Sequence, residues 1–162
     1  MPASDVLGEL GQGLEIARAE LNSLRLECCA VNLGTAKRAL DMAKTYAKQR
    51  VTFGEPLARR QHIQQMIVLG EIDIFASKLM LYNTAAEVNQ GENITLKAMM
   101  VKCFVTEMAI RFIDRAMQIY GGLGYSKDLP LEMMYRDARI FTIGDGPTEI
   151  MEWTIARNLL RK

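Results

Sequence analysis

The chain has 162 residues, enough for one domain that buries about 68 to 70% of the surface exposed by its unfolded chain. Twenty Lys and Arg residues against 19 Asp and Glu residues leave a formal net charge of +1, so no global field favours nucleic acid or an anionic membrane. Apolar runs stay well below the roughly 18 residues of a membrane-spanning helix, and the start "MPASDVLGEL" lacks the features of a signal peptide. We therefore expect a cytoplasmic protein that binds neither nucleic acid nor membrane.

The cysteines do not form a metal-binding pattern. Cys28 and Cys29 are adjacent, Cys103 is distant, and His62 is the single histidine. This spacing excludes a structural zinc site, and we expect no metal. Each cysteine lies on an apolar helical row, where a small buried hydrophobic residue is the common case, while a Cys–His nucleophile pair is the open alternative.

Helical periodicity dominates the chain from its start to its end. Apolar residues recur at alternating steps of three and four over 14–47, 63–88 and 96–119. In the first segment this row runs from Leu14 through Cys28 to Ala47. A fourth helical segment, 129–160, is interrupted by "IGDG", and period-two alternation gives a sheet little support. We predict an all-α fold, an antiparallel, up-down four-helix bundle over residues 13–162, preceded by a linker over residues 1–12.

A glycine cluster closes the third helix in "QIYGGLGYSKD", residues 118–128. A dinucleotide fingerprint would follow a strand and open a helix, so that interpretation fails. One interpretation is a helix C-cap, with Gly121 or Gly122 in the left-handed conformation. The other is that these glycines, with Gln118, let a ligand approach the backbone.

The stretch "YAKQRVTFGEPLARRQH", residues 46–62, joins the first two helices. The negative end of the helix dipole is enough to explain a cation at Arg50. An arginine fork followed by Thr52 and Phe53 also supplies bidentate donors for a pyrophosphate and a flat apolar face for a ring system.

A single carboxylate lies between two glycines in "FTIGDGPTEIMEW", residues 141–153. Asp145 is explained as a solvated acid near a helix start, where Pro147 fixes the turn. The alternative is that the turn presents this acid to a pocket.

The ordered set of motifs resembles the carboxy-terminal four-helix domain of the acyl-CoA dehydrogenases. "LGELGQG", "LDMA" with "YAKQRVTFGEPL", Gln61, "MQIYGGLGYSKDLPLEMMYRDARI" and the "DG" turn before "TEI" follow one another at the family's spacing. The resemblance covers essentially the whole chain. It implies a domain that closes over FAD and an acyl-CoA thioester, and a homo-oligomer, dimer or tetramer, in which one subunit's helices contact its neighbour's flavin.

The resemblance also implies a role for individual residues. FAD would be bound by Arg50, Thr52, Phe53, Gln61, Gln118, Gly121 and Gly122. Arg25 matches an arginine near the acyl-CoA site, and Asp145 matches the family's glutamate base. The implied reaction is α,β-dehydrogenation, in which the carboxylate removes an α-proton while the β-hydride leaves for the flavin.

The chain departs from the family pattern around its acid. Asp145 replaces a glutamate, which shortens its reach by roughly 1 Å. Gly144 stands where an aromatic residue is common, and Pro147 where a threonine is common. These differences suggest an altered pocket and an unusual substrate.

The family's amino-terminal helical domain and middle β-domain are not in this sequence, which implies either a fragment of a longer enzyme or a naturally split product. The competing interpretation is a non-catalytic helical module for oligomerisation or partner binding, and an acyl-CoA oxidase is a further alternative within the same fold.

Overall fold

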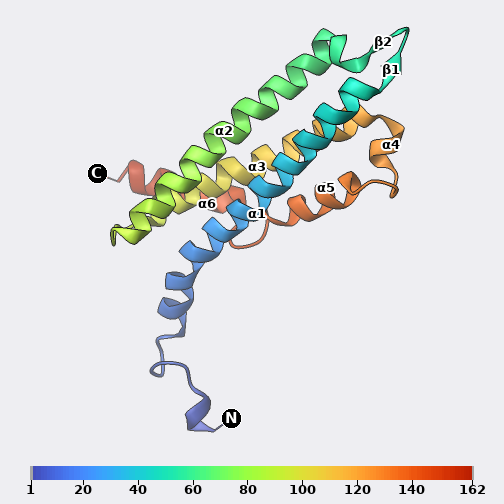
Figure 1. The fold of residues 1–162 in the computed structure, drawn as a ribbon. Coiled ribbons are helices and arrows are strands. Elements are labelled where there is room, and N and C mark those ends of the chain that lie inside the picture. Colours follow the sequence, from blue (N-terminus) through green and yellow to red (C-terminus); the bar gives the residue numbers. More distant parts are fainter. Residues whose placement is uncertain (1, 162) are drawn as a thin grey trace.

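A computed structural model describes residues 2–161 and confirms the all-α fold (Figure 1). Two short 3-10 turns, Ala3–Asp5 and Leu57–Arg59, accompany the main elements. Those elements, in chain order, are α1 (Gly13–Gln49), β1 (Val51–Thr52), β2 (Glu55–Pro56), α2 (Gln61–Asn89), α3 (Thr95–Tyr120), α4 (Gly122–Tyr125), α5 (Leu131–Ile140) and α6 (Thr148–Leu159).

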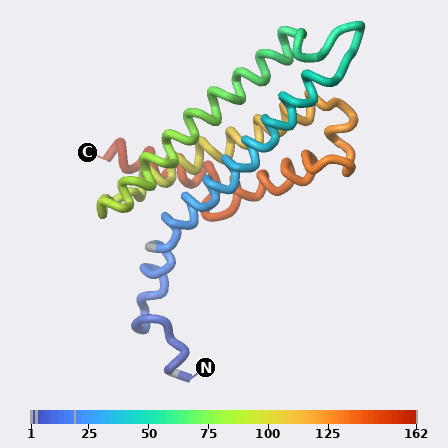
Figure 2. The backbone as a smooth tube through the Cα atoms, in the orientation of Figure 1, coloured from blue at the N-terminus to red at the C-terminus, as the bar shows by residue number. Residues whose placement is uncertain are grey.

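The three long helices run side by side in alternating directions, and α5 with α6 returns along the bundle as its fourth member (Figures 1 and 2). The largest interface in the bundle is between α1 and α3. Small side chains on α1, among them Ala36, Ala39 and Ala43, are fully buried there, opposite larger residues of α3 such as Met108 and Phe112. Pairing small with large side chains lets the two helices approach closely.

The core-facing row of α1 differs from the predicted row in its first half. The residues buried there are Arg25, Cys28, Cys29 and Asn32, whereas Val31 is exposed. A row counted from apolar residues alone misses Arg25 and Asn32 because both are polar. Their burial already indicates that this part of α1 faces something other than a simple apolar core.

The first turns of α1 extend away from the bundle together with the amino-terminal segment (Figure 1). Leu14, at the start of the predicted apolar row, is consequently exposed. Among residues 2–161, the structure contains no helix whose length and apolar character would let it cross a membrane.

A two-residue hairpin, absent from the prediction, connects α1 to α2. Val51 pairs with Pro56 and Thr52 with Glu55 in antiparallel register. The loop residues Phe53 and Gly54 both have positive φ, 52° and 81°, as the tight two-residue hairpin turn requires. Strands this short carry no alternation that a sequence pattern could reveal.

The fourth helical segment is interrupted where the sequence indicated. Helix α5 ends at Ile140, and α6 begins after Pro147, whose fixed φ suits a helix start. The intervening turn folds back because the Gly144 N–H donates to the carbonyl of Ile140 over 2.7 Å. This turn carries Asp145 to the side of α1.

Candidate functional site

Asp145 lies in a strained backbone conformation on the turn between α5 and α6. Its φ is 54°, and only Phe53 shares a positive φ among the described non-glycine residues. The next residue, Gly146, has a φ of 108°, whereas Gly144 does not adopt a positive φ. The strain therefore falls on the acid itself, and residues held in this way concentrate at functional sites.

Two residues of α1 hold Asp145 from one side. The Nε of Arg25 donates to the main-chain oxygen of Asp145 over 3.3 Å, and the thiol of Cys28 donates to its Oδ2 over 3.0 Å. Arg25 is 7% exposed and is itself oriented by Asn22, whose Oδ1 lies 3.3 Å from its Nη1. Burial, and then the hydrogen bond to Asp145, raise the pKa of the Cys28 thiol to about 12, so the thiol stays protonated and acts as a donor.

Lys102 of α3 holds the same turn from the other side. Its ammonium donates to the carbonyl of Gly144 over 2.7 Å and to that of Gly146 over 2.8 Å. The side chain is 0% exposed. Sequence periodicity placed this position among apolar neighbours, and only the unusual lysine in that stretch could have drawn attention to it.

The predicted FAD-binding residues gather at the far end of the bundle, around the hairpin. Arg50 caps the end of α1, Thr52 and Phe53 belong to the hairpin, and Gln61 begins α2. Phe53 is 97% exposed, so its ring is free to contact a ligand or another chain.

The end of α3 reaches the same place as the hairpin. The rings of Tyr46 and Tyr120 stack at 4.0 Å, which fixes the last turn of α3 against α1 just before Gly121. Gly121 caps α3, as one interpretation of the sequence predicted, but not in the predicted left-handed helical conformation. Its φ of 62° and ψ of −142° lie in a region that glycine alone adopts without strain. A side chain at Gly121 or Gly122 would meet nothing within 4 Å, which leaves the backbone open to a ligand.

Arg60 supports the hairpin and was missed by the sequence interpretation. Its Nη2 donates to the carbonyl of Thr52 over 2.9 Å, and its guanidinium lies 5.9 Å from the centre of the Phe53 ring. A cation at this distance from an aromatic face is attracted to it. Arg60 therefore holds in place the two hairpin residues that the sequence singled out.

The structure brings Arg25 and Asp145 together but keeps both away from the hairpin group. A helix rises about 1.5 Å per residue, so Arg25 and Arg50 are roughly 37 Å apart along α1. The two groups accordingly lie at different places on one chain (Figure 2). A ligand that contacts both the Arg25–Asp145 pair and the hairpin group must therefore span the length of the bundle or bind between two chains.

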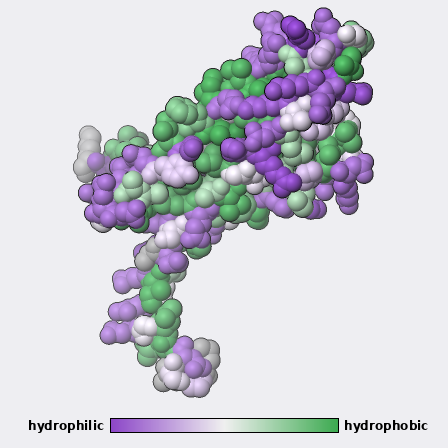
Figure 3. Space-filling model, viewed as in Figure 1, coloured by the Kyte–Doolittle hydropathy of each residue, from purple (hydrophilic) through white to green (hydrophobic). Residues whose placement is uncertain are grey.

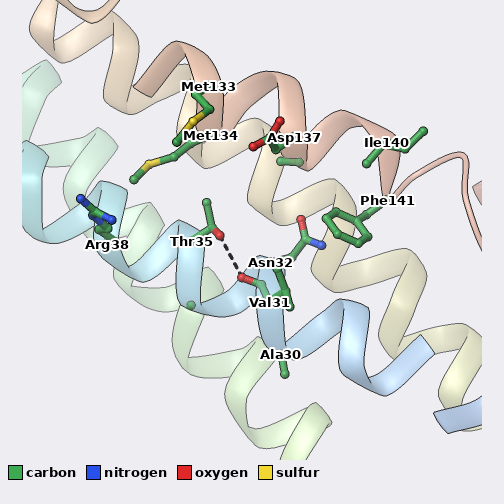
Figure 4. A pocket seen from close by; sticks show the side chains of 12 residues that line it. Ala30, Val31, Asn32, Thr35, Arg38, Met133, Met134, Asp137, Ile140 and Phe141 are labelled. Carbon is green, nitrogen blue, oxygen red and sulfur yellow. Dashed lines mark hydrogen bonds between the residues drawn. The ribbon is translucent and has the colours of Figure 1, made fainter. Parts of the chain in front are cut away.

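A groove lies between α1 and α5 (Figure 4), and Asp145 is not among the residues that line it. Its volume is about 640 Å³, and Phe141, Met134 and Val31 contribute much of its apolar wall. Asn32 borders it as well, with an Nδ2 that donates to the carbonyl of Cys28 over 2.8 Å. Its buried Oδ1 has no partner among residues 2–161.

The family model described as "Acyl-CoA dehydrogenase, C-terminal domain" matches residues 11–160, and the chain belongs to this family. It is 42% identical over 158 residues to a 3-(aryl)acrylate reductase from Clostridium sporogenes, covering 98% of this chain and 42% of that protein. It is 36% identical over 162 residues to a cyclohexane-1-carbonyl-CoA dehydrogenase from Geobacter metallireducens, covering 100% of this chain and 43% of that protein.

A solved structure supports the same assignment. Butyryl-CoA dehydrogenase from Megasphaera elsdenii superposes with a TM-score of 0.95 at 36% identity, covering 99% of this chain and 42% of that one. The chain thus spans less than half the length of the relatives that it matches, and it corresponds to their carboxy-terminal helical domain.

Proposed function

We propose that this chain provides the carboxy-terminal domain of an FAD-dependent acyl-CoA dehydrogenase, in which Asp145 is the base for α,β-dehydrogenation of an acyl-CoA thioester. The observation that carries the proposal is the strained Asp145 turn, held by Arg25 and Cys28 from α1 and by Lys102 from α3. An ordinary solvated acid near a helix start would need none of these buried partners.

The chemistry that these residues perform is proton removal. The α C–H bond of the thioester breaks, its proton passes to the Asp145 carboxylate, and its electrons form the new double bond as hydride leaves the β-carbon. The N–H of Asp145 donates to no group among residues 2–161, so it is available to bind the thioester oxygen as negative charge develops there. The start of α6 adds the positive end of a helix dipole nearby.

The residues at the hairpin end fit an FAD nucleotide by their chemistry. The guanidinium of Arg50 and the N–H of Gly122 offer donors to a pyrophosphate, and the lack of a side chain at Gly121 and Gly122 lets it approach, while the Gly121 N–H itself donates to the carbonyl of Gln118. The exposed Phe53 ring offers a stacking face. Thr52, Gln61 and Gln118 complete the proposed set. When bound, FAD supplies the acceptor for the β-hydride.

The distance between the two groups supports a homo-oligomer, dimer or tetramer. Arg25 with Asp145 would serve one active site, while the hairpin end would contact the flavin of a neighbouring subunit. Arg25 is proposed to border the acyl-CoA site through its hold on Asp145. The amino-terminal and middle domains, on the same or a separate chain, would supply further contacts to flavin and substrate, and we propose that the whole works in the cytoplasm.

An exposed apolar stripe on α2 is a suitable contact surface for the proposed oligomer. Residues along this helix at steps of three and four are each more than half exposed, and apolar residues gather there in Figure 3. They are Val68, Ile72, Phe75, Leu79 and Tyr82. This spacing is that of a seam between two packed helices, and we propose a second copy of the chain as its partner.

The same stripe favours the second candidate function, a helical assembly module without redox chemistry. The altered residues Gly144 and Pro147 beside the acid agree with that interpretation. The two proposals differ in whether flavin binds and is reduced.

The test is reconstitution with the amino-terminal and middle domains, fused or co-expressed. Bound flavin is followed by its visible absorbance, and its bleaching is timed after adding a series of acyl-CoA thioesters. We expect Asp145→Asn to keep bound flavin and to slow the bleaching by at least about a hundredfold. Equal bleaching rates would show that Asp145 is not the base, and an oligomer indifferent to flavin would establish the assembly module.

A further inference from the structure

We propose that Lys102 is a positioning residue of the active site, which clamps the peptide groups on both sides of Asp145 and so holds the carboxylate in its working pose. The inference rests on the proposed role of Asp145 as the base. It assigns a task to a buried cation that the proton transfer itself does not use.

Lys102 contacts the main chain on both sides of Asp145. The residues whose carbonyls accept from Lys102, Gly144 and Gly146, flank the acid, so one ammonium fixes the main chain before and after it. Asp145 has a φ of 54° at this point. A residue in that conformation relaxes unless its surroundings over-determine it, and two short charge-assisted hydrogen bonds supply that constraint.

The charge of Lys102 is buried. Lys102 is 0% exposed, yet its hydrogen-bond partners are main-chain carbonyls rather than a carboxylate. Burying an ammonium is unfavourable, and a position of α3 that lies between Val101 and Val105 could have carried an apolar residue. The lysine is therefore better explained by what it does to the turn than by packing.

Lys102 is placed to position Asp145 and not to react with substrate. Burial lowers the pKa of its ammonium, and the negative charge of Asp145 opposes that shift. A lowered pKa is often a sign of a catalytic lysine. Here the amine is sealed from solvent, and two of its three protons are engaged by the turn, so it has no route to a thioester.

The clamp also works together with the α1 side of the site. Cys28 and Arg25 reach the side chain and the carbonyl of Asp145, while Lys102 reaches the neighbouring peptide groups. If the clamp is removed, the turn is free to rotate out of its positive φ and to carry the carboxylate away from Cys28. Two independent signals, amide exchange in the turn and access to the Cys28 thiol, report that release.

The first experiment compares the wild-type chain with Lys102→Met and with Lys97→Met, an exposed lysine of the same helix that pairs with Glu87. Hydrogen exchange followed by mass spectrometry, and alkylation of Cys28, are measured on folded samples. We expect Lys102→Met to speed exchange over residues 142–148, and Cys28 alkylation, by about tenfold or more, with α2 unchanged, and Lys97→Met to match wild type. Unchanged exchange and alkylation in folded Lys102→Met would overturn the clamp.

A variant that keeps a donor guards against misfolding. Lys102→Gln retains an amide donor and buries no charge. We therefore expect its hydrogen-exchange rate in the turn to lie between the rates of the wild type and Lys102→Met. Should neither variant fold, the wild-type chain decides by NMR. A Lys102 ammonium held by two carbonyls gives a slowly exchanging Nζ–H signal in neutral buffer, and its absence would overturn the clamp.

The second experiment tests positioning in the enzyme reconstituted with its other domains. Per bound flavin, we expect Lys102→Met to lower kcat by roughly a hundredfold and to change KM by less than about twofold, because substrate contacts persist while the base is misplaced. Asp145→Asn is assayed beside it. If Asp145→Asn is inactive and Lys102→Met is fully active, the positioning role is wrong; if both are active, the proposed base is wrong.

Discussion

The Sγ of Cys28 lies 3.0 Å from Oδ2 of Asp145, so a thiol on α1 ties down the one acid of the turn. Hydrogen bonds to charged groups contribute about 1.5 to 3 kcal/mol, and a thiol is a weak donor, so we expect about 1 kcal/mol here. Urea denaturation should therefore find Cys28→Ala less stable than Cys28→Ser by about that amount, because serine retains a donor. Equal stability of the two variants would mean that the contact contributes nothing.

Alkaline pH should unfold the chain through its buried thiols. Burial raises the pKa of Cys29 from 9.0 to about 12, so the folded state keeps a proton that the unfolded state has lost in this range. The contribution of the Cys29 thiol to stability is therefore fully present below about pH 9 and is lost as the pH rises towards 12. In Cys29→Ala, the fall in unfolding free energy per pH unit should be smaller by about 1.4 kcal/mol.

The lowered pKa of Lys102 has the opposite effect on stability. As the pH rises, the lysine loses its proton in the folded chain before it does in the unfolded chain, so the folded state gains stability. Lys102 is present in both proteins, and Cys29 is the smallest of the influences on its pKa, so the Lys102 effect is nearly the same in the two. Denaturant titrations between pH 8 and about 11 measure the two slopes. Parallel slopes would show that the Cys29 thiol ionises as readily in the folded chain as in the unfolded one.

A glycine on α2 should be irreplaceable for reasons of space. A Cβ on Gly70 would lie 2.0 Å from Cε2 of Phe112, whose ring is fully buried on α3. We expect Gly70→Ala to lower the free energy of unfolding by about 1 to 3 kcal/mol. Gly34→Ala is the matched control, because its Cβ meets nothing within 4 Å and alanine should raise helix stability by about 0.5 to 1 kcal/mol. Similar effects at both positions would contradict the packing account.

Charges on the α2 stripe should disperse the proposed oligomer. Phe75→Glu combined with Leu79→Lys places two charges at exposed apolar positions, where they leave the bundle core intact. We expect a smaller species in sedimentation velocity with unchanged helical circular dichroism. Gln65→Glu, an exposed change on the same helix, should sediment as wild type. If the double variant sediments as wild type, the partner surface lies elsewhere.

The sequence was sufficient for the helices because their signals are long and redundant. Segments 63–88 and 96–119 each repeat their apolar spacing over several turns, and the structure places α2 and α3 on them. The hairpin escaped detection because two-residue strands have no measurable alternation, and its turn uses Phe53 where a glycine or asparagine is usual.

The site was only partly visible in the sequence because its supports are distant along the chain. Asp145 drew attention through its flanking glycines, yet Lys102 and Cys28 come from other helices and gain meaning only when the chain folds. Arg25 was predicted from the family resemblance alone. Its burial could not be expected from its residue type, because arginine side chains are mostly exposed. Apolar periodicity passes over such polar positions, whereas in the folded chain they contact the Asp145 turn.

The distance along α1 between Arg50 and Arg25, which contacts Asp145, has a genetic consequence. If each catalytic centre combines the acid of one subunit with the hairpin of the next, a chain carrying Asp145→Asn and a chain carrying Arg50→Met are both inactive as homodimers. A dimer of one chain of each kind has one complete centre out of two. In that centre, the unchanged Asp145 of the Arg50→Met chain meets the unchanged hairpin of the Asp145→Asn chain. Two defective alleles would thus rescue each other, which two lesions confined to a single centre cannot do.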